Sequence, residues 1–400
     1  MKDKRDVVII SACRSAIGDF GGALAKVRAY ALAAQVMGAA IKQAGIDPGE
    51  LDDVILGDCV QAPDEANTAR TAMLAAGIPD HVPAVTIQRQ CSSAMQAMGQ
   101  ASHAIRCGDA DLIIAGGVES MSNAPYVLMQ ARWGARLRHG QMMDAMWEML
   151  HSGSTLLDPP GYIMGQTAEN LARKYHISRE EQDIIALRSH NNAEAAIENG
   201  KFAEEIVPIS IPQRKGEPKI FDTDEHVRRG LVMDDLSKLR PVFAKDGTVT
   251  AGNSSGLNDG SAICVLASRE KAEAIGAKPL AKIHSFAAAG CDPTIMGWGP
   301  VPATEKLLAR TGVTLKDIEL IELNEAFAAQ YLACEKGLGL NREITNVNGS
   351  GVGLGHPTGC TGARITISLL YEMKRRGNNL GLATLCVGGG MGMSMLIENE

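Results

Sequence analysis

The chain has few aromatic residues, no paired cysteine motif and no surplus of basic residues. Phe, Tyr and Trp make up 4% of 400 residues, so the aromatic surfaces on which single-stranded nucleic acid stacks are not indicated. A formal net charge of −7 also argues against a nucleic-acid partner, which needs a concentrated basic surface. Nine cysteines are scattered singly without a CxxC pair, which indicates neither a zinc ribbon nor a disulfide framework. The expected setting is a reducing cytoplasm.

Long apolar runs are also missing. The charged segment 1–6 leads into the four-residue run 7–10, which is too short for a signal peptide or a membrane span. The end, 397–400, carries no lipidation or peroxisomal tag. We therefore expect no membrane partner. Hydrophobic residues make up 45% of the chain and charged residues 21%, which is enough for a large core, and 43 glycines favour close packing of helices on a sheet.

Short apolar runs alternate with alanine-rich segments of helical spacing, which predicts strands alternating with helices. The expected strands are 7–11, 54–56, 85–87, 111–117, 261–266, 282–286, 318–323, 343–347 and 380–387. The expected helices are 29–44, 66–76, a helix after Cys91, 303–310, 326–336 and 360–376. This order indicates a mostly parallel sheet covered on both faces.

Residues 120–250 differ in character, because charged residues are denser there than in the rest of the chain and two of the three Trp lie within them. Within them, Ser178 and Glu181 form a capping-box pattern that opens a helix. We interpret the region as an inserted lid or docking subdomain. Its methionines at helical spacing favour a core or subunit interface over an acyl-chain contact, since Met is a common gap filler. These methionines are Met142, Met143, Met146 and Met149.

Cys91 follows the predicted strand 85–87 and opens a helix. Helix amides at that place favour thiolate and lower a cysteine pKa, which suits a nucleophile. The alternative is a small buried residue, as most free cysteines are.

The C-terminal part repeats the order of the first. Segments 91–117 and 359–390 each run helix, turn, apolar strand and glycines, so two similar units would bring their strand ends together. Asn324 follows one strand, Cys386 ends another, and His356 lies between Gly355 and Pro357. Together with Cys91 they supply two thiols, an imidazole, an amide side chain and glycine N–H groups.

This combination resembles the thiolase family over essentially all 400 residues. The motifs that carry the resemblance are 117–123 (GVESMSN), 165–170 (GQTAEN), 252–260 (GNSSGLNDG), 353–362 (GLGHPTGCTG) and 386–392 (CVGGGMG). It implies an α/β fold in which two similar βαβαβ-type halves form a layered α/β/α/β/α core. The halves would be 1–120 with 251–278, and 279–400, and 121–250 would be an inserted loop subdomain. A homo-oligomer, a dimer or tetramer, is also implied.

The resemblance implies a reversible Claisen condensation and thiolysis: acetyl-CoA and acyl-CoA give 3-ketoacyl-CoA and CoA by a ping-pong route. CoA is then a substrate, and no permanently bound cofactor or metal is expected. Cys91 would carry the acyl group with His356 as its base, and Cys386 would move the proton of the enolate. One oxyanion hole would be His356 with a water held by Asn324, and the other the N–H groups of Cys91 and Gly388.

The CoA contacts implied by the resemblance are Arg228 near the nucleotide, Ser255 on the pantetheine, and Met164 and Met296 around the thioester. Ile163 stands where many acetoacetyl-specific members carry His, and Gln88 and Ala94 also depart from the usual pattern. Acetoacetyl-CoA is the expected substrate. The alternative is a broader or longer-chain degradative 3-ketoacyl-CoA thiolase.

Two other functions are alternatives to consider from the sequence. Gly252–Gly256 satisfies GxSxG, which would make Ser254 a hydrolase nucleophile, but that motif needs a strand before it and a helix after it. A binding protein that holds acyl-CoA without turnover would lack Cys91, His356 or Cys386, and all three are present.

Overall fold

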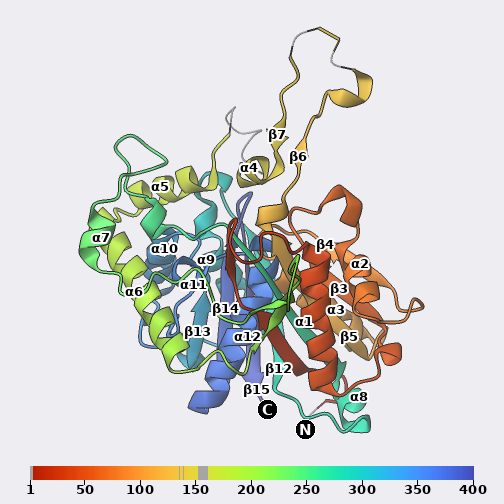
Figure 1. Ribbon diagram of the computed structural model, residues 1–400. Helices are drawn as coiled ribbons and strands as arrows, with labels where there is room; N and C mark the ends of the chain where they lie inside the picture. Colours follow the sequence, from red (N-terminus) through yellow and green to blue (C-terminus); the bar gives the residue numbers. More distant parts are fainter. Residues whose placement is uncertain (1–2, 135, 138, 152–160) are drawn as a thin grey trace.

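An eleven-stranded sheet runs through the molecule in the order β13-β14-β15-β12-β1-β11-β5-β3-β4, with β2 beside β11 and β8 beside β1 (Figure 1). The structure, a computed structural model, describes residues 3–134, 136–137, 139–151 and 161–400. The strands of this sheet are β1 (Val7–Ser15), β2 (Gly18–Asp19), β3 (Asp53–Gly57), β4 (Ala84–Ile87), β5 (Leu112–Ser120), β8 (Ile206–Val207), β11 (Asn258–Ser268), β12 (Ala281–Gly290), β13 (Leu320–Leu323), β14 (Leu380–Val387) and β15 (Met391–Asn399).

The prediction of a mostly parallel sheet is wrong for the middle of this sheet. Only the outer pairs β3–β4, β3–β5 and β13–β14 and the short pair β1–β8 are parallel, and the long central strands pair antiparallel. One reason is β15, a strand that the sequence pattern did not predict. After β14 the chain reverses through Gly388–Gly390 and returns beside it, with Cys386 opposite Gly392. Gly389 and Gly390 have φ of 83° and 81°, which glycine adopts without strain.

Helices cover both faces of the sheet. They are α1 (Ala29–Ala44), α2 (Thr68–Ala75), α3 (Ser93–Cys107), α4 (Ala145–Leu150), α5 (Met164–Lys174), α6 (Arg179–Glu198), α7 (Met233–Ser237), α8 (Arg269–Ala274), α9 (Pro300–Thr311), α10 (Ala328–Leu338), α11 (Gly351–Leu354) and α12 (Thr358–Arg376). Two of them, α3 and α12, pack together between the two halves of the sheet. One hydrophobic cluster unites α3 and α12, a second holds α1 and α2, and a third holds α5, α9 and α10. The layered α/β/α/β/α arrangement is confirmed.

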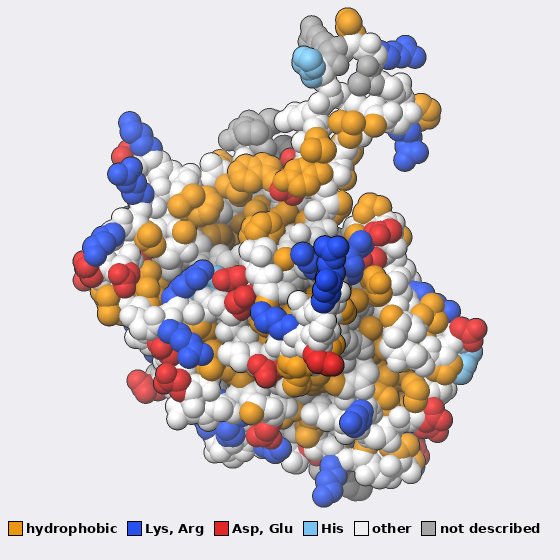
Figure 2. Space-filling model, viewed as in Figure 1, with side chains coloured by type: hydrophobic (Ala, Val, Ile, Leu, Met, Phe, Trp, Pro, Cys, Tyr) orange, Lys and Arg blue, Asp and Glu red, His pale blue; other side chains and the backbone are white. Residues whose placement is uncertain are grey.

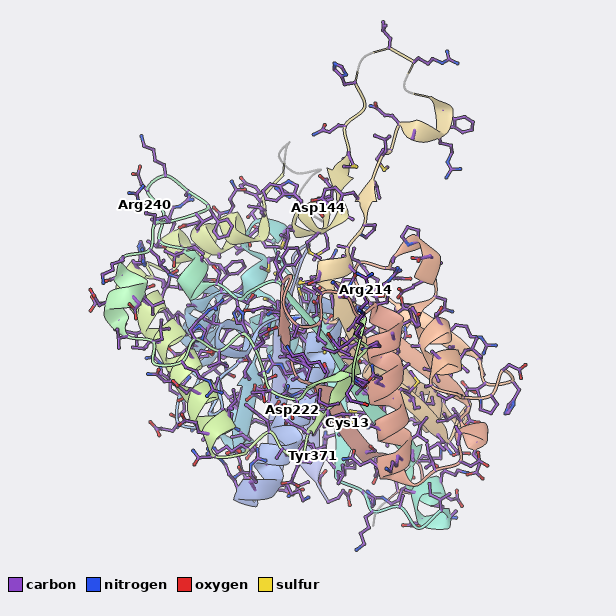
Figure 3. The ribbon with its side chains drawn as sticks, viewed as in Figure 1. Cys13, Asp144, Arg214, Asp222, Arg240 and Tyr371 are labelled. Atoms are coloured by element: carbon purple, nitrogen blue, oxygen red, sulfur yellow. The ribbon has the colours of Figure 1, made fainter. Side chains whose placement is uncertain are left out.

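The central layer is the pair α3 and α12, one from each half of the chain. Every residue of α12 from Thr358 to Met373 is buried, as expected of a helix with neighbours all round. A Cβ at Gly362 would lie 2.6 Å from the backbone N of Met95, so glycine there allows the two helices to approach closely. Tyr371 of α12 also donates a hydrogen bond to the Ala12 carbonyl of β1 at 2.8 Å, close to Cys13 (Figure 3). The two similar units thus pack against each other through α3 and α12.

Most predicted elements lie within a few residues of the observed ones. Segment 343–347 is an exception, because it is not a strand and contributes only an isolated bridge between Thr345 and Ile321. Asn346 turns the chain there with φ of 50°. The capping box at α6 is confirmed: Ser178 Oγ accepts from Glu181 N at 3.1 Å, and Glu181 Oε2 accepts from Ser178 N at 2.7 Å.

The middle segment forms an arm and a helical cover. The arm (the described residues 126–134, 136–137 and 139–144) stands away from the body at the top of Figure 1 and contains the pair β6 (Tyr126–Val127) and β7 (Met143–Asp144). At its base Asp144 caps α4 by accepting from Met146 N at 2.9 Å (Figure 3). The hairpin β9 (Ile209–Ile211) and β10 (Lys219–Phe221) carries Arg214 in its loop. Residues 152–160 of the predicted insertion lie outside the described residues, and the three-part division of the chain stays a prediction.

Among the residues that the structure describes, no helix is long and apolar enough to cross a membrane.

Candidate active site

A cavity of about 420 Å³ opens between the two halves and the middle segment. Six of the predicted site residues line it: Cys91, His356, Gly388, Ser255, Met164 and Met296. Many of its other walls are apolar, among them Met121, Trp147, Met149, Leu150, Ile163, Val242, Phe243 and Phe327. Cys386, Asn324 and Arg228 are not in its wall. The cavity therefore combines a thiol and an imidazole with a largely apolar lining, as ligand sites commonly do.

Cys91 lies in a tight turn between β4 and α3. The side chain of Ser93 fixes this turn, because its Oγ accepts from Arg89 N at 2.9 Å and donates to the Gln90 carbonyl at 2.6 Å. Gln90 has φ of 45°, a left-handed conformation that places the next residue out of line with the strand. The turn presents the Cys91 side chain to the cavity.

The prediction that a helix terminus lowers the pKa of Cys91 is wrong. Helix α3 begins only at Ser93, so Cys91 lies before its first turn. The pKa of Cys91 is raised to about 11, mainly by burial; hydrogen bonds from the backbone N–H groups of Gly388 and Cys91 partly offset this rise, and the charge of Glu119 adds to it. The resting group is a neutral thiol. The two N–H groups at its sulfur are the pair expected to bind an oxyanion.

His356 is held between α11 and α12. Its N–H donates to Asn258 Oδ1 at 2.9 Å, and Gly355 before it has φ of 100°, which favours glycine. Its Nδ1 lies 2.7 Å from Thr361 Oγ1, whose own hydrogen is donated to the Pro357 carbonyl at 2.8 Å. This network assigns the proton to Nδ1 and leaves Nε2 as the acceptor. Nε2 has no hydrogen-bond partner among the described residues.

Burial, followed by the charge of the buried Arg364 guanidinium, lowers the pKa of His356 to about 3. The imidazole is therefore neutral at physiological pH and available as a base. An ion pair of thiolate and imidazolium would be costly in this buried site before substrate enters. Proton transfer from Cys91 to His356 is thus coupled to attack on the substrate, where the sulfur ends as a neutral thioester.

Cys386 and Asn324 lie behind the cavity wall and are fully buried. Burial, followed by the nearby Cys91, raises the pKa of Cys386 well above its usual range, so it is a thiol at rest. Asn324 follows β13, and its N–H donates to the Thr384 carbonyl of β14 at 2.9 Å. Neither polar atom of its side chain has a partner within the described part of the chain. A buried amide with two unpaired polar atoms fits the predicted role of holding a water.

Arg228 lines a second pocket of about 330 Å³, together with His190, His226 and Leu231. This pocket shares Ala251 and Ser254 with the main cavity, so the two adjoin. The Arg228 side chain is 62% exposed, and its Nη2 lies 3.5 Å from Asp19 Oδ2. A cation at the outer end of an apolar cavity suits a substrate with an anionic, solvent-facing end.

The backbone around Ser254 does not form a hydrolase nucleophile turn. Ser254 follows the short 3-10 helix η5 (Ala251–Asn253) and precedes β11, which reverses the strand-to-helix order that GxSxG needs. Its hydroxyl donates to the Thr250 carbonyl at 2.7 Å.

Sequence reasoning missed several residues of the site. Thr361 lies within the motif 353–362, five residues after His356. This spacing from His356 would have suggested Thr361 as a partner for the imidazole. Met149, interpreted as core or interface, lines the cavity, whereas Met142 is exposed and Met146 is buried. Val242 and Phe243 lie in an irregular segment whose sequence carries no pattern that predicts a pocket.

A neutral thiol beside two backbone N–H groups, with a neutral imidazole facing the same cavity, defines a site for cysteine-dependent acyl transfer. Comparison with known proteins agrees with this class. The family model "Thiolase, N-terminal domain" matches residues 7–270, and "Thiolase, C-terminal domain" matches residues 277–399. The chain belongs to the thiolase family and is an acyltransferase of that family.

Relatives of known name match along nearly the whole chain. An acetyl-CoA acetyltransferase of Pseudomonas aeruginosa is 49% identical over 401 residues, covering 99% of this chain and 100% of that protein. The crystal structure of the Bacillus anthracis acetyl-CoA acetyltransferase is 56% identical with a TM-score of 0.95, covering 99% of each chain. Human mitochondrial 3-ketoacyl-CoA thiolase, in a structure with CoA, is 40% identical with a TM-score of 0.94, covering 99% of this chain and 98% of that one.

Proposed function

We propose that Cys91 is the nucleophile of an acetyl-CoA acetyltransferase, an enzyme that condenses two acetyl-CoA to acetoacetyl-CoA and CoA and runs the reverse thiolysis. One observation carries this proposal: the Cys91 thiol and the unpaired Nε2 of His356 belong to the same cavity, and the Gly388 N–H is directed at the sulfur. The test is to find where acetyl-CoA leaves its acetyl group on the chain.

In the first half-reaction the Cys91 sulfur attacks the thioester carbonyl of acetyl-CoA. Its proton passes to His356 Nε2, while Thr361 keeps Nδ1 protonated. The negative charge that develops on the carbonyl oxygen is stabilised by the N–H groups of Cys91 and Gly388, and each such donor is worth about 10²–10³ in rate. The C–S bond to CoA then breaks, and the CoA sulfur takes the proton from His356. Acetyl-Cys91 and free CoA remain.

In the second half-reaction the Cys386 thiol first gives its proton to the neutral His356 imidazole, and the resulting thiolate takes the α-proton of a second acetyl-CoA. The enolate oxygen is held by the protonated imidazole of His356 and by the water on Asn324. The enolate carbon attacks acetyl-Cys91, the Cys91–acyl bond breaks, and acetoacetyl-CoA leaves as the Cys91 sulfur takes the proton of the His356 imidazolium. In thiolysis the same groups act in reverse, and Cys386 returns a proton to the leaving enolate.

The two joined pockets suggest how CoA binds. The thioester would lie between Met164 and Met296, with the pantetheine along Ser255, whose N–H donates to the Ala326 carbonyl at 2.9 Å. The phosphates and nucleotide would then reach the pocket of Arg228. CoA complexed with the human mitochondrial thiolase supports CoA as the ligand.

The preferred acyl chain length of the substrate is the first point to test. Ile163 lines the cavity and is held at the start of α5, where its N–H donates to Gln166 Oε1 at 3.1 Å. An apolar side chain there discriminates weakly between acyl groups, so we expect acetoacetyl-CoA to be a good substrate and somewhat longer 3-ketoacyl-CoAs to react measurably. Ile163→His should raise the ratio of kcat/KM values for acetoacetyl-CoA over a six-carbon substrate by about 10-fold.

The matched control is Ile163→Leu, which keeps the wall apolar and should leave this ratio near that of the wild type. A wild type that accepts nothing beyond four carbons, with a ratio unchanged by Ile163→His, would show that Ile163 does not set the acyl pocket.

We further propose a homo-oligomer, a dimer or tetramer, in which the arm packs against another copy. The arm carries Met129, Trp133 and Leu137, which are 73%, 83% and 89% exposed. Figure 2 shows hydrophobic side chains gathered where the arm leaves the body. Apolar side chains exposed to this extent favour association.

Light scattering should give a mass of at least two chains. The double variant Trp133→Ser, Leu137→Ser should shift it toward a smaller assembly. Ile184→Ser, on α6 and 43% exposed, removes an apolar side chain away from the arm and should leave the mass unchanged. A stable wild-type monomer with full activity would refute the proposal.

The cytoplasm is the proposed location, because the mechanism needs two reduced thiols, Cys91 and Cys386, and the other cysteines are also free. The two half-reactions are balanced by thiol and imidazole chemistry, so we propose CoA as a substrate and no permanently bound cofactor.

A further inference from the structure

The Glu119 carboxylate lies at the end of β5 and is fully buried. It accepts four hydrogen bonds from two separate segments. Cys59 N and Val60 N, after β3, donate at 3.2 Å and 3.1 Å. Thr358 Oγ1 and Gly359 N, at the start of α12, each donate at 2.7 Å. Because all four neighbours are donors, only a carboxylate, with two accepting oxygens, satisfies this position.

Each of the two segments adjoins one of the proposed catalytic groups. Cys59 Sγ donates to the Gln90 carbonyl at 3.0 Å, in the residue before Cys91. Thr358 and Gly359 begin the helix that follows His356 and carries Thr361 one turn later. Gly359 also lies directly against β5, since a Cβ at Gly117 would come 2.1 Å from its carbonyl oxygen. A single side chain thus connects the nucleophile's turn, in one half, to the base's helix, in the other.

The charge of this carboxylate is well defined by its neighbours. Burial and the charge of Glu119 raise the pKa of Asp58 well above its usual range, so Asp58 is the neutral member of the pair. Thr68 Oγ1 donates to Asp58 at 2.5 Å. Glu119 accepts hydrogen bonds from four donors and lies at the N-terminus of the 19-residue α12, where negative charge is favoured.

Several other groups feel the Glu119 charge. They are Cys59 after β3, Cys91 before α3, Asp259 on β11 and Cys360 on α12, and in each the charge raises the pKa. The Cys91 thiol also faces Cys386 on β14, while Arg364 of α12 faces His356. The Glu119 charge therefore disfavours the Cys91 thiolate, so its benefit to the reaction must come from geometry.

We propose that Glu119 is a positioning residue that holds the Cys91 turn and the His356 helix in register across the two halves of the molecule. This inference rests on the roles proposed above for Cys91 and His356. Replacing Glu119 should therefore have two measurable effects that act in opposite directions. Loss of the charge makes the Cys91 thiol more acidic, and loss of the four hydrogen bonds nevertheless slows acyl transfer.

Glu119→Gln tests both parts. Its amide group would point at backbone donors, so the two segments should shift, and a misplacement of about 1 Å costs about 10²-fold in kcat. The Michaelis constant for CoA should change little. The pH midpoint for alkylation of Cys91 by iodoacetamide, followed on the Cys91 peptide by mass spectrometry, should move to lower pH.

Asp58→Asn is the matched control. It changes the adjacent buried carboxyl, which is already neutral, and should leave both kcat and the alkylation midpoint near those of the wild type. Glu119→Asp is the second variant, because it keeps the charge but is one methylene shorter. It should slow acyl transfer without moving the midpoint, and it decides the question if Glu119→Gln does not fold.

Turnover close to wild type in Glu119→Gln or Glu119→Asp would overturn the proposal. So would equal slowing in Asp58→Asn, which would indicate a general loss of stability. The underlying function is tested separately, because acetyl-CoA should still acetylate Cys91 in Glu119→Gln, only more slowly. Acetylation elsewhere in the wild type would contradict the proposed function and not the packing role of Glu119.

Discussion

Replacing Cys91 with Ala is expected to lower kcat for thiolysis of acetoacetyl-CoA by about 10⁴-fold or more, since the covalent route disappears with the sulfur. The substitution removes one atom from a half-buried side chain in a turn held by Ser93, so the fold should persist. Substrate should still bind, because the walls of the cavity are unchanged. Steady-state kinetics and a thermal melt measure the two quantities.

Cys107→Ala is the control for this variant. Cys107 is exposed at the opposite end of α3 and should keep wild-type turnover when replaced. Turnover near wild type in Cys91→Ala would show that another residue is the nucleophile.

The second large effect distinguishes the role of the base, His356, from that of the second thiol, Cys386. His356→Ala should slow acetylation of Cys91 by about 10²–10⁴-fold, because Nε2 is the acceptor that the Thr361 network leaves unprotonated. Cys386→Ala should still be acetylated by acetyl-CoA. It should fail to exchange the α-protons of acetyl-CoA with solvent deuterium and fail to condense.

Rapid-quench acetylation and deuterium exchange by mass spectrometry measure the two steps independently. If both variants lose the same step to the same extent, the division of labour between His356 and Cys386 is incorrect.

Local signals explain which elements could be predicted from the sequence. Helix α1 ends at Ala44 because Gly45 takes a left-handed cap with φ of 65°, and the Gly45 position marked that end. Strand β14 was predicted at its observed bounds, since its apolar run is followed by glycines. Strand β15 is not predicted, because its first residues, Met391 and Gly392, continue a glycine-rich motif. Without β15, the antiparallel centre of the sheet could not be predicted either.

The site residues were identifiable by their motifs, but their states depended on contacts distant in the sequence. Cys91 was predicted to be acidic from its local position, whereas burial and Glu119 raise its pKa. His356 is neutral because its own burial, followed by the charge of Arg364 on α12, lowers its pKa to about 3. The four hydrogen bonds of Glu119 join segments about 60 and 240 residues away, and no spacing in the sequence predicts such a contact.

The most direct test of the central claim is to incubate the wild-type protein with acetyl-CoA alone and to map the added mass. The first half-reaction should leave one acetyl group on the peptide that contains Cys91, and the adduct should persist in Cys386→Ala, which cannot form the enolate of a second acetyl-CoA. The adduct should disappear when CoA is added, as the half-reaction reverses. An acetyl group on any other residue, or no adduct under conditions in which the enzyme turns over, would contradict an acyl-Cys91 mechanism.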